Sequence, residues 1–137
     1  MSNGAGYSTD YSDTLITAST DCPVEQGAVP GKAGTFAAFQ HALLAEPYRL
    51  TSDDLLFEVH AIRNAVPQDA RAEARAALFA KPQACLRASP LVKQFGWGLH
   101  HDAGGRVARV AVESADYARL LADPAVTKVP GMRSKRA

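Results

Sequence analysis

The chain has 137 residues, of which 47% are hydrophobic and 21% are charged, and its formal net charge is +1. This length and apolar content argue against wholesale disorder and predict one folded domain. No stretch approaches the ~20 consecutive apolar residues of a membrane span, so we expect no membrane partner. The first residues hold neither a basic start nor an apolar run, which argues against a secretory signal and favours a cytoplasmic protein.

The first part of the chain predicts a tail, a strand and a loop. Residues 1–12 are small and polar, which indicates a flexible N-terminal tail ahead of a single domain over 13–137. Residues 14–20 are rich in β-branched side chains and predict a strand. Residues 21–34 hold two prolines and three glycines and predict an irregular loop.

Two helical segments and one ambiguous segment follow. Thr35 is a suitable N-cap, and apolar side chains recur after it at helical spacing until Pro47 ends the helix. In residues 55–63 apolar and polar side chains alternate, which predicts a strand, although a helix stays open as the alternative. Residues 67–80 are rich in alanine with interspersed charges and predict a second helix.

The last part of the chain predicts a hairpin, a helix and a strand. Residues 95–101 and 106–112 flank the turn sequence Asp-Ala-Gly-Gly, which is typical of a β-hairpin. Ser114 is a suitable N-cap for the next helix, and Pro124 ends it. Residues 126–129 predict a short final strand.

The predicted element order is therefore β-α-β-α-β-β-α-β. It lacks regular βαβ repetition and contains a hairpin. We therefore expect a single α+β domain with a mainly antiparallel sheet and about three helices.

The charges are unevenly distributed along the chain. Residues 1–69 carry nine acidic and three basic side chains, whereas residues 70–137 carry five acidic and twelve basic ones. This asymmetry indicates either a basic binding surface or two halves that attract each other within one fold.

The segment from Cys85 to Gly105 concentrates reactive side chains and contains the only tryptophan. Cys85 with His100 or His101 is a weak candidate for nucleophilic catalysis. Because His100 and His101 are adjacent on a predicted strand, they point to opposite faces, so we predict no metal site. No Walker loop or dinucleotide fingerprint is present, and we predict no cofactor. Cys22, far from Cys85, is expected to be a free thiol.

Basic side chains near an aromatic residue favour an anionic partner. Arginine and lysine contact phosphates or carboxylates, and an exposed tryptophan stacks on bases or walls a pocket. We further expect the basic C-terminal segment to fold back beside residues 85–97. The predicted anion-binding residues are Arg87, Lys93, Trp97, Arg133, Lys135 and Arg136.

Several distinct short motifs are distributed along the chain from about Asp13 to Arg136. They include Cys-Leu-Arg-Ala-Ser-Pro-Leu at 85–91, Gly-Trp-Gly at 96–98 and Met-Arg-Ser-Lys-Arg at 132–136. With these motifs the chain resembles a family of small, mostly bacterial proteins catalogued only as a domain of unknown function. The resemblance implies no activity, but it implies that the basic C-terminal segment is ordered or used in binding.

The sequence predicts a non-enzymatic, single-domain binding protein. Its partner would be anionic, either nucleic acid or a phosphorylated or acidic ligand. Two alternatives stay open. One is a small enzyme that uses Cys85 with a histidine of the hairpin, and the other is a protein-interaction module that forms a homodimer through an exposed sheet edge.

Overall fold

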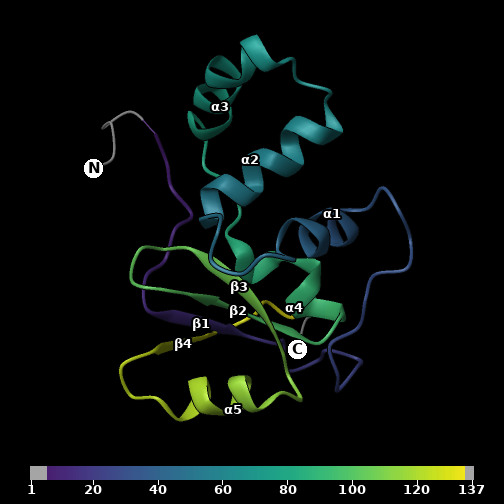
Figure 1. Ribbon diagram of the computed structural model, residues 1–137, viewed down its shortest axis with the longest axis vertical. Helices are drawn as coiled ribbons and strands as arrows, with labels where there is room; N and C mark the ends of the chain where they lie inside the picture. Colours follow the sequence, from purple (N-terminus) through teal and green to yellow (C-terminus); the bar gives the residue numbers. More distant parts are fainter. Residues whose placement is uncertain (1–5, 135–137) are drawn as a thin grey trace.

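A four-stranded sheet forms the centre of the molecule, with helices on both faces (Figure 1). The computed structural model describes residues 6–134. The elements are β1 (Thr14–Thr17), α1 (Phe36–Leu43), α2 (Ser52–Arg63), η1 (Gln68–Ala70), α3 (Arg71–Phe79), η2 (Leu86–Ala88), α4 (Pro90–Gln94), β2 (Trp97–His101), β3 (Val107–Ala111), α5 (Ala115–Ala122) and β4 (Thr127–Pro130).

The sheet has the strand order β3-β2-β1-β4 and is mixed. The predicted hairpin is confirmed, since β2 pairs with β3 in antiparallel register, and β1 pairs with β2 in the same way. The prediction of a mainly antiparallel sheet needs correction at β4, which runs parallel to β1. The reason is that α5 carries the chain from β3 across one face of the sheet, so that β4 starts from the same end as β3.

The side chains of each strand alternate between two apolar layers. On one face, Ile16 and Leu99 pack with residues of α1, α2 and α4. On the other face, Leu15 and Val110 pack with Leu120 of α5. Figure 1 shows this division, with α5 alone below the sheet and α3 lying beyond α2.

The prediction of a strand over 55–63 is wrong, because these residues belong to helix α2. Two helical stripes are buried on different sides of α2. Leu55 faces the sheet, whereas Phe57 and Ala61 pack on α3 together with Phe79. A helix that is buried on two sides places apolar residues at alternate positions, and this imitated the pattern of a strand.

The start of α2 is fixed by a capping box. The Thr51 hydroxyl accepts the Asp54 N–H, and the Asp54 carboxylate accepts the Thr51 N–H, both at 3.1 Å. Thr35 and Ser114 cap α1 and α5 as predicted. The helix count was too low, since α2 was assigned as a strand and α4 is only five residues long. In residues 6–134 no helix is both long and apolar enough to span a bilayer.

The segment that precedes β1 lies beside α2 and α3. The Tyr7 N–H donates to the Phe79 carbonyl at 2.8 Å. The Thr9 N–H and hydroxyl donate to the Asp53 carboxylate at 2.8 and 2.7 Å. These contacts place Tyr11 over the C-terminal end of β2, next to Cys85.

Candidate functional site

Cys85 lies directly before η2 and is half-buried. Its Sγ is 3.3 Å from the Tyr11 hydroxyl, and the Tyr11 ring stands edge-on to the His101 ring with 5.3 Å between centroids. Burial and the hydrogen bond to Cys85 raise the pKa of Tyr11 to about 12. In the described part of the chain, Cys85 forms no hydrogen bond with a histidine. Tyr11 therefore contacts both Cys85 and His101, through its hydroxyl and its ring respectively.

His100 and His101 point to opposite faces of β2, as predicted. His101 is completely buried, and its burial lowers its pKa to about 4, so the ring is neutral at pH 7. His100 Nδ1 lies 2.7 Å from the Tyr48 hydroxyl, and burial also lowers the pKa of His100. Within residues 6–134, no group of three or more potential ligands could hold a metal ion.

Arg87 holds the C-terminal segment. Its Nε donates to the Pro130 carbonyl at 2.6 Å, and its own carbonyl accepts the Met132 N–H at 2.7 Å. Ser19 extends the contact, because its hydroxyl donates to the Met132 carbonyl at 2.5 Å. The chain that directly follows β4 thus lies beside Arg87 at Met132. The return of the basic segment itself stays a prediction, because residues 135–137 lie outside the described ones.

The other predicted anion-binding residues lie in different surroundings. Val92, the neighbour of Lys93, lies against Gly131, and Arg133 follows Met132 at the surface. Trp97 is only 9% exposed, and its indole N–H donates to the Ala28 carbonyl at 2.8 Å, so its ring is not open for base stacking. Lys135 and Arg136 lie outside the described residues.

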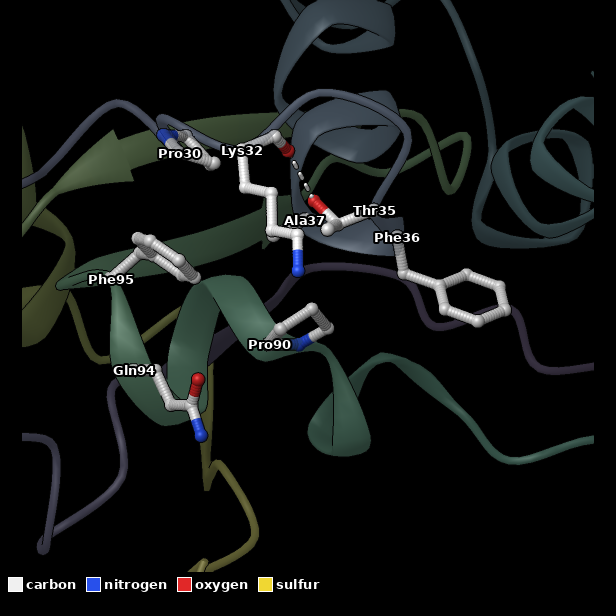
Figure 2. Close-up of a pocket in the computed structure, with 8 residues that line it drawn as sticks. All are labelled: Pro30, Lys32, Thr35, Phe36, Ala37, Pro90, Gln94 and Phe95. Atoms are coloured by element: carbon white, nitrogen blue, oxygen red, sulfur yellow. Dashed lines mark hydrogen bonds between the residues drawn. The ribbon is translucent and has the colours of Figure 1, made fainter.

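A separate cavity of about 380 Å³ opens between the loop before α1, the start of α1, and α4. Its walls are mainly apolar. Figure 2 shows the Lys32 side chain extending into the space between the Phe95 ring and Pro90. The cavity is lined by Pro30, Lys32, Thr35, Phe36, Ala37, Pro90, Gln94 and Phe95.

Local hydrogen bonds shape the loop at this cavity. The Thr35 hydroxyl donates to the Lys32 carbonyl at 2.9 Å (Figure 2). It also accepts the Ala38 N–H at 3.2 Å. One residue therefore closes the loop and starts α1. Across the cavity, Ser89 caps α4 and Pro90 occupies its first turn, where proline is favoured. The ammonium group of Lys32 is left at the cavity without a carboxylate partner in residues 6–134.

Sequence reasoning did not identify Lys32 or this cavity. Lys32 and Pro90 are almost sixty positions apart, and only the packing of α1 on α4 brings them together. The sole local signal was the cap at Thr35, which fixes the end of the loop that carries Lys32.

Comparisons with known proteins give one match. No curated protein and no solved structure is detectably similar to this chain. The sequence profile of one family matches residues 7–137, which is nearly the whole chain. The resemblance inferred from the motifs is therefore confirmed, and the chain belongs to the family of unknown function DUF6157.

Proposed function

We propose that this protein binds a small organic anion that has an apolar body. The observation that carries the proposal is the ammonium group of Lys32 at an apolar cavity of about 380 Å³. Ligand pockets commonly measure roughly 300–1,000 Å³ and combine apolar walls with a few polar groups that orient the ligand. This proposal keeps the anionic partner expected from the sequence but moves the contact to Lys32.

The charge at the cavity favours a carboxylate over a phosphate. Lys32 is the one charged residue among those that line the cavity, so it balances a single negative charge. A phosphate group carries close to two charges at neutral pH, and one of them would stay uncompensated. The Gln94 amide and the positive end of the α1 dipole add weaker attraction for a carboxylate.

The apolar walls of the cavity favour a ligand whose remaining part is apolar. Phe95 and Pro90 present carbon surface on the α4 side, and Phe36 and Pro30 do so on the loop side. Burying apolar surface contributes about 25 cal/mol per Å², so an alkyl or aryl group of the ligand supplies most of the affinity. The carboxylate supplies orientation.

The test is isothermal titration of the protein with hexanoate, octanoate and decanoate, with octanol as the uncharged probe. We expect the carboxylates to bind and octanol to bind more weakly. Lys32→Gln should weaken carboxylate binding by about tenfold, which corresponds to about 1.4 kcal/mol, and leave octanol unchanged. Lys81→Gln, a change of an exposed lysine away from the cavity, should have no effect.

Two results would overturn the proposal. One is that none of the three carboxylates binds at millimolar concentration. The other is that Lys32→Gln binds octanoate as tightly as the original protein. Circular dichroism checks that both variants keep the fold, which we expect because neither lysine is buried.

A second candidate function involves a larger anionic partner, such as single-stranded nucleic acid, at Arg87 and the C-terminal segment. The bond from the Met132 N–H to the Arg87 carbonyl supports it, because it keeps Arg133 close to Arg87. Fluorescence anisotropy with a labelled oligonucleotide should show binding that weakens with salt. Replacing Arg133, Lys135 and Arg136 together with alanine should reduce the affinity and the salt dependence, and unchanged affinity would refute this second function.

A further inference from the structure

Arg109 on β3 forms no ion pair with any carboxylate of the described residues. Its guanidinium carbon lies 5.0 Å from the centre of the Trp97 ring, so it stacks on the indole. Within residues 6–134 its side chain forms no ion pair, and its Nε is buried without a hydrogen-bond acceptor. Burial lowers the pKa of Arg109. A half-buried arginine ordinarily pairs with a carboxylate, since an uncompensated charge is costly away from water.

His41 approaches the same indole from α1. Its ring stands edge-on to the Trp97 ring, with 5.4 Å between centroids. Its Nε2 is buried and has no hydrogen-bond partner in the part of the chain that the structure describes. Burial and the positive charge of Arg109 lower the pKa of His41, so it is neutral at pH 7. A neutral imidazole donates a hydrogen bond from whichever ring nitrogen carries the proton. Arg109 and His41 thus both lie beside the Trp97 ring, each with one side-chain nitrogen that has no hydrogen-bond partner within residues 6–134.

We propose that Arg109 and His41 form a binding site for an oxyanion, that is, a carboxylate or phosphate group. The guanidinium of Arg109 offers several N–H donors in a planar fork that matches two oxygens of such a group. His41 adds a donor from the α1 side, and Trp97 forms the wall. The indole N–H takes no part, because it already donates to the Ala28 carbonyl.

This site is independent of the cavity at Lys32. Neither Arg109 nor His41 lines that cavity. The two sites also differ in chemistry. The cavity at Lys32 is mainly apolar with one ammonium group, whereas the guanidinium of Arg109 lies over an aromatic ring. Failure of octanoate to bind at Lys32 would therefore leave the Arg109 site untouched.

Trp97 is the only tryptophan and makes the test direct. Sodium phosphate and sodium acetate are titrated separately into the protein in a chloride buffer, and the fluorescence of Trp97 and the 15N shifts of the His41 ring are followed. We expect a saturable change in both signals with at least one of the two anions. A stronger response to phosphate assigns a phosphate ligand, and a stronger response to acetate assigns a carboxylate ligand.

A matched pair of variants separates a site from general screening. Arg109→Met keeps an unbranched side chain on the indole but removes the guanidinium, and we expect it to weaken anion binding at least tenfold. Arg106→Met removes an exposed arginine just before β3 and should bind as the original protein does. Calorimetry measures both, since Arg109→Met itself changes the Trp97 signal. Non-saturable responses to both anions, or equal affinity in Arg109→Met, would overturn the proposal.

Discussion

Gly98→Ala tests how tightly α5 is seated on the sheet. A Cβ atom at position 98 would lie 2.6 Å from Cε1 of Tyr117 and 3.2 Å from the carbonyl oxygen of Ile16. Real Cβ contacts are essentially never shorter than 3.0 Å, so the Tyr117 ring must move. That movement strains or breaks the bond in which the Tyr117 hydroxyl accepts the Ala18 N–H at 3.2 Å.

The expected cost follows from two effects. Overpacking of a core by one methyl costs about 1–3 kcal/mol, and loss of one hydrogen bond adds about 1 kcal/mol. We therefore expect Gly98→Ala to lower the free energy of unfolding by about 3 kcal/mol. For a domain of this size, that corresponds to a fall in Tm of roughly 10 °C.

Urea denaturation, followed by circular dichroism and by Trp97 fluorescence, measures the effect. Gly104→Ala is the control, because a Cβ there meets nothing closer than 3.6 Å, and we expect a change below about 0.5 kcal/mol. Tyr117→Ala removes the obstacle, so the double variant with Gly98→Ala should be more stable than the sum of the two single effects by at least about 1 kcal/mol. Strict additivity, or a neutral Gly98→Ala, would refute the steric argument.

Three further predictions concern caps and buried polar groups. Thr51→Ala removes half of the α2 capping box and should lower the free energy of unfolding by about 1 kcal/mol, as measured by thermal denaturation. Thr51→Ser keeps the hydroxyl and should lower it less. Equal losses in the two variants would contradict the role of Thr51 as a cap. Ser89→Ala removes the hydroxyl that donates to the buried amide oxygen of Gln40 at 2.5 Å, and it should lower the free energy of unfolding by about 1–3 kcal/mol in urea denaturation. Adding Gln40→Leu removes the unpaired amide and should restore part of that loss. No recovery in the double variant would argue against an unpaired amide as the cause. Burial lowers the pKa of His101 to about 4, so as the pH falls the histidine becomes protonated in the unfolded chain before it does in the folded protein. The free energy of unfolding should therefore decrease as the pH drops from about 6.5 towards 4, by up to about 3 kcal/mol. His101→Gln should flatten this part of the stability profile, and an identical slope in both proteins would refute the assignment.

Elements with a local cause were predictable from the sequence. Thr35 and Ser114 cap their helices as expected, and the turn at 102–105 joins β2 to β3. Each of these features depends on residues within a few positions of one another. The prediction failed at α2, where burial against the sheet and against α3 produced an alternating pattern that only the tertiary structure explains.

The candidate sites were less predictable, because they depend on packing between distant segments. Trp97 was expected to be available for ligands, but the loop at 27–28 covers it, and a Cβ at Gly27 would lie within 3.0 Å of its ring. Arg109 was counted among the basic residues of the second half of the chain without a distinct role. Its isolation from every carboxylate of the described residues becomes visible only when the sheet is assembled.

The parallel pairing of β1 with β4 has a consequence for how the protein is made. β1 lies inside the sheet between β2 and β4, which follow it in the sequence by about 80 and about 110 residues. At a synthesis rate of about 10 residues per second, β1 leaves the ribosome roughly 10 s before β4 is complete. During that interval α1 to α3 can form from local contacts, while β1 still lacks β4 as a partner on one of its edges. During synthesis, residues 14–17 therefore expose a strand edge that can pair with another chain, although the same segment is paired on both edges once folding is finished.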